Sequence, residues 1–541
     1  MSLLKTSISS TEVFMQSIKT RTLFATLSAA ASLCIALSLT ATACAQVKPN
    51  ALFSDHMVLQ SGMSVPIWGA ADPGEKVTVT LNGASKSAVA DPAGKWIVRL
   101  VNLKAGGPFE MTIAGSKGEA PITVSDVLVG EVWLASGQSN MEFNVSAKGH
   151  PPYGLIDEAK EIAAANFPQL RMFTVKQNKS FAPLSDEVGT WKICTPQTVP
   201  DFSAVGYLFG RDLNQELHVP VGIVLSSYGA STAEAWIPRT TLASDPQLKP
   251  MLDKFDARYN YFKAHPNAND ADAPPAPLTI NARPGRGGAL RDPVQDQHQP
   301  TVLFNGMIAP IAPYAIRGAI WYQGESIVGG AHGVMLYGHV MDTMITQWRK
   351  LWGEGNFPFF EVQLPGQQNV SNNPLIREQQ TAILSLPNTG IAVVLDTSEA
   401  HNVHPKNKEP LGYRLELLAL AKAYHWDVEY SGPVYQSMKV EGDSIRIKFT
   451  HAAGLNAKGA TLHWFQIAGS DQKFVDADAK IDGDSVVVSS PSVPHPVAVR
   501  YAWDNYPNTA NLYNASGLQA APFRTDTWDA MPPIEAQFTA K

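Results

Sequence analysis

The 541-residue sequence predicts an α/β fold built on a parallel sheet, with β-rich regions before and after it in the chain. Between residues 126 and 430, short apolar runs typical of buried strands alternate with segments of helical periodicity. The clearest apolar runs are 222–225, 318–321, 359–362 and 390–395, and the clearest helical segments are 335–351 and 411–424. Because such alternation is typical of βαβ units, we expect a parallel sheet covered by helices on both faces.

The two flanking regions, 46–125 and 431–541, show a different pattern. Short β-type runs are separated there by turn formers such as Asp72-Pro73-Gly74. This pattern predicts a β-sandwich or jelly-roll accessory region. The sequence leaves open whether the two regions are separate modules or one composite sandwich built from both ends of the chain.

Residues 1–45 have the features of a signal peptide. Lys19 and Arg21 precede an apolar stretch, and Ala43-Cys44-Ala45 forms an A-x-A cleavage pattern. We therefore expect an exported protein, periplasmic or secreted, with no membrane span. The alternative is a lipoprotein acylated at Cys44.

Composition narrows the class of protein further. Apolar residues make up 45% of the chain and charged residues 17%, which is ordinary for a globular protein with a large core. The formal net charge is −6 and no long basic block is present, so nucleic acid is not an expected partner. After signal cleavage Cys194 would be the remaining cysteine, which excludes an intrachain disulfide.

Ser139 is the first candidate for catalysis. It lies in the segment 137–141, Gly-Gln-Ser-Asn-Met, directly after the apolar run 132–135. A serine at the exit of a buried strand, flanked by a small residue, is where many α/β hydrolases place their nucleophile. The alternative interpretation is a turn in which Ser or Asn caps the next helix.

His404 is the candidate base. It lies in a polar loop after the apolar run 390–395, and the unperturbed pKa of histidine suits proton transfer near neutral pH. His401 and His404, together with Asp396, do not match a known metal-binding signature, so we expect no metal site.

Two other segments follow strands and can polarise a carbonyl group. Gly229, in the segment 226–231, lets the backbone approach a substrate and offer an N–H group. Gln323, in the segment 321–326, carries a side-chain amide that can donate to an oxyanion. The alternative for each is a tight turn between a strand and a helix.

Together these segments resemble the sialate O-acetylesterase family of the SGNH/GDSL hydrolases, and the resemblance covers nearly the whole mature chain. The segments that carry it are 130–133, 137–142, 202–207, 234–236, 303–308, 321–326 and 404–408, with 57–60 and 499–503 at the two ends. It implies an SGNH-hydrolase-like (flavodoxin-like) sheet, Ser139 as nucleophile and His404 as base. It also implies an oxyanion hole formed by Ser139, Gly229 and Gln323, with no metal or cofactor.

One departure from the family pattern concerns the acid that supports the histidine. Relatives usually carry an aspartate two or three residues before it, whereas this chain has Asn402 and His401 there. Asn402 can orient an imidazole but cannot stabilise its charged form. Asp396, Glu399 and Glu325 are further candidates for support, and a Ser–His dyad is the other alternative.

The resemblance implies a carbohydrate O-acetylesterase that removes acetyl esters from sugars through a serine acyl-enzyme. The sugar is sialic acid or a plant hemicellulose such as xylan or xyloglucan. The alternative is a non-catalytic carbohydrate-binding protein with a degenerate hydrolase core, an interpretation suggested by the missing aspartate. The loop 265–300 is longer than is usual in relatives, which indicates a different substrate surface.

Overall fold

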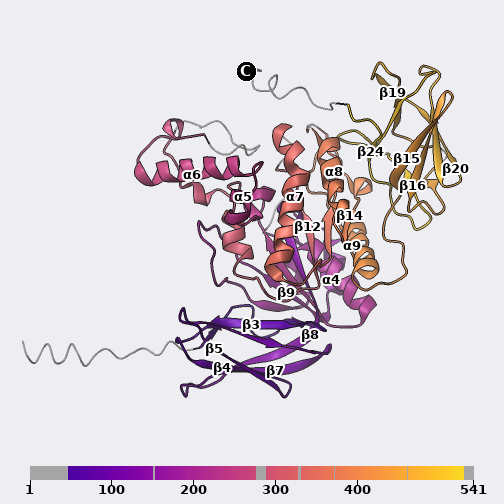
Figure 1. The fold of residues 1–541 in the computed structure, drawn as a ribbon. Helices are drawn as coiled ribbons and strands as arrows, with labels where there is room; N and C mark the ends of the chain where they lie inside the picture. Colours follow the sequence, from indigo (N-terminus) through magenta and orange to yellow (C-terminus); the bar gives the residue numbers. More distant parts are fainter. Residues whose placement is uncertain are drawn as a thin grey trace, which may run out of the picture.

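The computed structural model describes residues 47–149, 153–275, 288–326, 331–368, 370, 372–459 and 461–528 (Figure 1). The predicted signal peptide therefore lies outside the described residues. In the described part of the chain, no helix is both long and apolar enough to cross a membrane.

The centre of the molecule is a mainly parallel sheet with the strand order β10-β9-β11-β8-β12-β13-β14. All neighbouring pairs along this path are parallel except the edge pair β10–β9. The strands are β8 (Ile122–Gly137), β9 (Phe167–Thr174), β10 (Trp191–Cys194), β11 (Val221–Ser227), β12 (Gly318–Tyr322), β13 (Phe359–Val362) and β14 (Thr389–Ala392). The predicted strands at 222–225, 318–321 and 359–362 lie within β11, β12 and β13. The run 390–395 is part strand and part 3-10 helix.

Helices cover both faces of this sheet. On one face, Trp133 of β8 packs edge-on against Phe209 of α4 (Ala204–Leu217), which lies beside α9 (Glu409–Lys422). On the other face, Trp321 of β12 packs against Trp348 of α7 (Ala331–Trp352), which lies beside α8 (Asn373–Thr381). The two helical segments expected from periodicity correspond to α7 and α9. The remaining helices are α2 (Ser139–Glu142), α3 (Glu158–Ala164), α5 (Arg239–Ser244) and α6 (Lys249–Ala264).

The N-terminal β region is joined to the central sheet through β8. The first half of β8 pairs with β7 (Gly106–Gly115) and β2 (Val58–Gln60), and its second half pairs with β11 and β12. The expected boundary at residue 125 therefore falls inside one continuous strand. The other strands of this region are β1 (Lys48–Pro49), β3 (Val65–Ala70), β4 (Lys76–Leu81), β5 (Ala84–Val89) and β6 (Lys95–Leu100).

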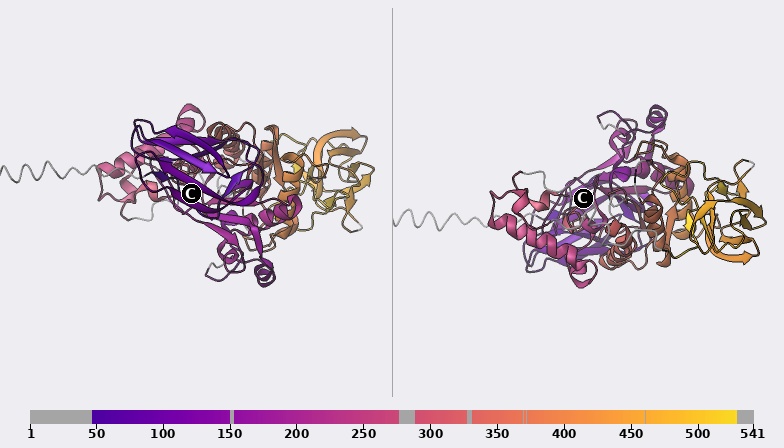
Figure 2. Two further views of the ribbon diagram at one scale, coloured as in Figure 1. Left: turned by 90° about the horizontal axis from the view of Figure 1, so that it is seen from below. Right: turned by 90° about the horizontal axis from the view of Figure 1, so that it is seen from above.

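The C-terminal β region forms its own sheets, β15-β16-β21-β20 and β19-β18-β22-β24, with the short pair β17-β23. In the described residues it shares no sheet with the N-terminal β region, and the two lie on different sides of the α/β core (Figures 1 and 2). Its strands are β15 (Val434–Glu441), β16 (Ser444–Thr450), β17 (Asn456–Ala457), β18 (Phe465–Ala468), β19 (Phe474–Asp476), β20 (Asp478–Asp482), β21 (Ser485–Ser489), β22 (Ala498–Tyr501), β23 (Leu512–Tyr513) and β24 (Phe523–Arg524).

Candidate active site

Ser139 lies at the carboxyl end of β8, where the chain turns sharply from strand to helix. The turn begins at Gly137, whose φ of 134° is a conformation that side chains other than glycine rarely adopt. A Cβ at this position would also collide with the carbonyl oxygen of Tyr322 in β12. The backbone N–H of Gln138 donates to that same carbonyl oxygen at 2.9 Å, and Ser139 then begins the short helix α2. This geometry lifts the serine hydroxyl above the edge of the sheet.

His404 reaches Ser139 from the loop that follows β14. Its Nε2 atom lies 2.8 Å from Ser139 Oγ, which is hydrogen-bonding distance between a base and a nucleophile. The ring of Tyr153 contacts the imidazole edge-on, with 5.4 Å between the centroids. The structure thus brings together the two residues that the sequence singled out, 265 positions apart.

The surroundings of His404 favour its neutral form. Burial, together with the positive charge of Lys408, lowers the pKa of the imidazole to about 4. At neutral pH the ring is therefore unprotonated and able to accept the serine proton.

None of the four candidate supporting residues, Asn402, Asp396, Glu399 and Glu325, forms a hydrogen bond with the imidazole. Asn402 Oδ1 accepts the backbone N–H of His404 at 3.0 Å, and its amide donates to Glu399 Oε2 at 2.9 Å. Asp396 forms a two-bond pair with Arg414 of α9, at 2.8 and 2.6 Å. Glu325 instead accepts a hydrogen bond from Asn140. Among the described residues no hydrogen bond reaches His404 Nδ1, so the observed arrangement is a Ser–His dyad.

Gly229 lies against the nucleophile. A Cβ built on it would stand 3.8 Å from Ser139 Cβ and 3.1 Å from Glu142 Oε2, so a larger side chain would enter the space beside the serine. This position brings Gly229 next to the side chain of Ser139.

Gln323 is placed differently from our expectation. Its side chain is fully buried, and Nε2 donates to Gln138 Oε1 at 3.1 Å and to the Ser231 carbonyl oxygen at 3.0 Å. These two bonds use both protons of the amide, so in this conformation none remains for an oxyanion. Gln323 instead links the turn that carries Ser139 to the loop that carries Gly229. The sequence could not distinguish these two roles of Gln323, because a glutamine amide can donate either to an oxyanion or to neighbouring oxygen atoms of the protein.

Two lysines near the dyad also escaped the sequence reasoning. Lys408 is only 2% exposed, and its Nζ donates to Asn140 Oδ1. Lys179 Nζ donates to the hydroxyl of Tyr228, the neighbour of Gly229, at 2.8 Å. No pattern in the sequence separates these two lysines from exposed ones such as Lys406 and Lys176.

No group of three or more His, Cys, Asp or Glu side chains suited to a metal ion occurs in the ranges that the structure describes. The site is thus built from hydroxyl, imidazole and amide groups at the carboxyl edge of the parallel sheet. Ligands of open α/β sheets bind at this edge.

Comparisons with known proteins identify the class of enzyme to which this chain is similar. Residues 294–415 match the family model described as carbohydrate esterase, sialic acid-specific acetylesterase. A solved carbohydrate acetylesterase from Xanthomonas citri is similar over 89% of this chain and 100% of its own, with 35% identity and a TM-score of 0.76. The fold is therefore that of a carbohydrate acetylesterase.

Curated relatives define the family. The sialate O-acetylesterase of Mus musculus is 30% identical over 87% of this chain and 92% of its own length. That of Homo sapiens is 28% identical over 87% of this chain and 91% of its own length. The chain belongs to the sialate O-acetylesterase family and is an esterase.

Proposed function

We propose that this protein is an exported carbohydrate O-acetylesterase that uses Ser139 as its nucleophile and His404 as its base. The observation that carries the proposal is the 2.8 Å contact between Ser139 Oγ and His404 Nε2 at the carboxyl edge of the sheet. The family supports ester hydrolysis, and the dyad supplies a route for it.

The proposed reaction has two steps. Ser139 Oγ attacks the acetyl carbonyl while His404 Nε2 takes the hydroxyl proton. His404 then returns that proton to the sugar oxygen as the ester C–O bond breaks. His404 next deprotonates a water molecule, which attacks the carbonyl carbon of the acetyl-serine, and then returns that proton to Ser139 Oγ as the ester bond to serine breaks and acetate leaves. The backbone N–H groups of Ser139 and Gly229 stabilise the oxyanion in both steps.

The direct test is acetate release from a panel of O-acetylated sialic acids, acetylated xylan and acetylated xyloglucan oligosaccharides. Removing the nucleophile in Ser139→Ala is expected to lower turnover by on the order of 10⁶-fold. Thermal unfolding of the variant serves as the control for folding. Turnover within about tenfold of wild type in a folded Ser139→Ala protein would contradict the proposed mechanism.

Two classes of acetylated sugar fit the proposal, and Lys179 distinguishes them. Its ammonium donates a hydrogen bond to the hydroxyl of Tyr228, the residue before Gly229. No carboxylate of the described residues pairs with this ammonium. A carboxylated sugar such as sialic acid can form an ion pair with this ammonium, whereas neutral xylan and xyloglucan carry no charge that could pair with it.

Lys179→Met therefore tests the sugar class. If the substrate is carboxylated, we expect KM to rise by on the order of tenfold for acetylated sialic acids and to stay constant for an aryl acetate. The exposed Lys176, on the same segment, provides the matched control variant Lys176→Met. Efficient release of acetate from hemicellulose alone, unchanged by Lys179→Met, would instead assign the enzyme to plant polysaccharides.

Export is proposed from the sequence of residues 1–45. Cleavage after Ala45 predicts a mature protein that begins at Gln46, and intact-mass measurement checks it. A chain beginning at an acylated Cys44 would show a lipoprotein instead.

A further inference from the structure

Lys408 is a buried cation directly behind the dyad. Its side chain is 2% exposed, and Nζ lies 5.0 Å from the ring centroids of both Phe143 and Tyr322. Its Nζ donates a hydrogen bond to a neutral amide, at Asn140 Oδ1. Burying an ammonium in this way is costly, and burial lowers the pKa of Lys408 to about 7. A buried charge that costs folding free energy and lies next to the reacting atoms indicates a functional role.

The amide that Lys408 holds connects both halves of the dyad. Asn140 follows Ser139 in the chain and is fully buried. Its Nδ2 donates to the carbonyl oxygen of Val403, the residue before His404, at 2.9 Å, and also to Glu325 Oε1. Lys408 fixes which way the amide points, because an ammonium can only donate and therefore selects the oxygen. The nucleophile turn and the base loop are thus tied together through one oriented side chain.

We propose that Lys408 is a positioning residue for the Ser139–His404 dyad. It orients Asn140 so that the loop of His404 is held at hydrogen-bonding distance from Ser139, and its charge keeps the imidazole unprotonated. It thereby takes over the orienting role of the carboxylate that is absent behind His404, whereas its charge acts on the imidazole in the sense opposite to that of a carboxylate. This inference rests on the proposed serine mechanism.

The charged and titratable groups around His404 determine the sign of the effect. Tyr153 lies against the ring, Glu325 reaches it through Asn140, Glu399 reaches it through Asn402, and Glu142 lies beside Gly229. Burial and Lys408 lower the pKa of His404. Activity requires neutral His404, so it is lost as pH falls through the pKa of the imidazole. Removing the Lys408 charge raises that pKa and moves the loss to higher pH.

The experiment compares Lys408→Met with the matched control Lys406→Met, whose side chain is exposed on the same loop. Aryl-acetate kinetics are measured from pH 4 to 9. For Lys408→Met we expect kcat to fall by on the order of 10- to 100-fold with KM nearly constant. We also expect the acid limb of kcat/KM to move up by roughly half to one pH unit. The Lys406→Met profile should overlie that of wild type.

A folded Lys408→Met protein with an unshifted acid limb would overturn the inference, since a merely structural lysine would change amplitude alone. If the variant does not fold, Lys408→Gln replaces it, since its amide can still donate to Asn140 Oδ1 but carries no charge: an acid limb moved to higher pH supports the inference, and an unshifted one contradicts it. Failure of the serine mechanism is distinguished by Ser139→Ala in the same assay, which would then retain activity.

Discussion

At the residue scale, Asn402 shows how a loop can be arranged without the expected carboxylate. Its oxygen accepts the backbone N–H of His404, and its amide donates to Glu399 Oε2 and to the His404 carbonyl oxygen at 2.8 Å. All of its hydrogen bonds therefore shape the loop backbone. The imidazole is positioned by the fold of the loop and by Tyr153.

This arrangement predicts that Asn402→Asp does not restore a triad. The change removes both amide donations and places a second carboxylate beside Glu399, so we expect the free energy of unfolding to fall by about 1–2 kcal/mol. We also expect kcat to fall, because the loop that carries His404 loses these two hydrogen bonds. Urea unfolding and aryl-acetate kinetics check both effects. A rise in kcat would show instead that the side chain reaches His404 Nδ1 and acts as the missing acid.

At the element scale, β8 connects the accessory region to the catalytic edge. Its burial pattern changes along its length: the first residues alternate between exposed and buried, and those from Val127 to Gly137 are all buried. Asp126, with a φ of 56°, marks the change. Strand periodicity is thus interrupted inside one strand, which explains why the sequence indicated a domain boundary there.

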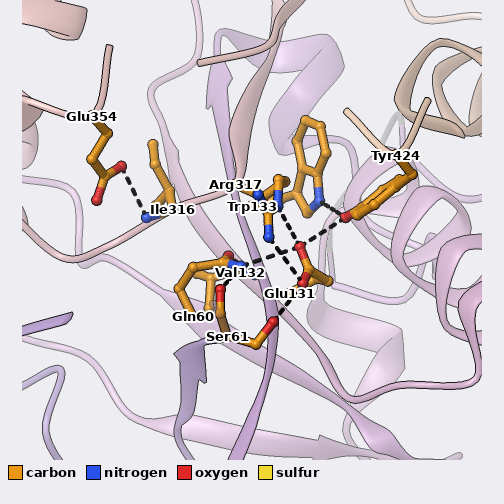
Figure 3. Close-up of polar contacts among 9 residues, drawn as sticks. All are labelled: Gln60, Ser61, Glu131, Val132, Trp133, Ile316, Arg317, Glu354 and Tyr424. Carbon is orange, nitrogen blue, oxygen red and sulfur yellow. Dashed lines mark hydrogen bonds and ion pairs between the residues drawn. The ribbon is translucent and has the colours of Figure 1, made fainter. Parts of the chain in front are cut away.

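Glu131 is the polar junction of this strand (Figure 3). It is 6% exposed and accepts from Arg317 Nε at 2.6 Å, Ser61 Oγ at 2.8 Å, Gln60 Nε2 at 3.1 Å and Tyr424 Oη at 3.1 Å. The donors come from the N-terminal β region, the residue before β12 and the segment after α9. One carboxylate therefore joins three parts of the fold.

Glu131→Ala is expected to lower the free energy of unfolding by about 3 kcal/mol, since it leaves the Arg317 guanidinium and three other donors without their acceptor. Denaturant titration measures the loss. The exposed pair Lys249–Asp253 offers a matched control, because Asp253→Ala should cost less than about 1 kcal/mol. Equal effects of the two substitutions would show that Glu131 is not a structural junction.

At the scale of the whole molecule, the sequence predicted the α/β core well because short, mostly apolar strands alternate there with segments of helical periodicity. It placed Ser139 and His404 on strand-end loops, where the structure brings them into contact. Contacts between segments far apart in the chain could not be predicted from the sequence. The pairing of Asp396 with Arg414 and the internal hydrogen bonds of Gln323 depend on how loops meet in space. The same holds for the burial of Lys408.

The central claim of this account is that Ser139, activated by His404, forms the acyl-enzyme. The most direct measurement is mass spectrometry of the protein after reaction with a fluorophosphonate, a reagent that labels activated serines. The account predicts a single adduct on Ser139, formed much more slowly in His404→Ala and absent from Ser139→Ala. An adduct on another residue, or equal labelling of wild type and His404→Ala, would contradict it.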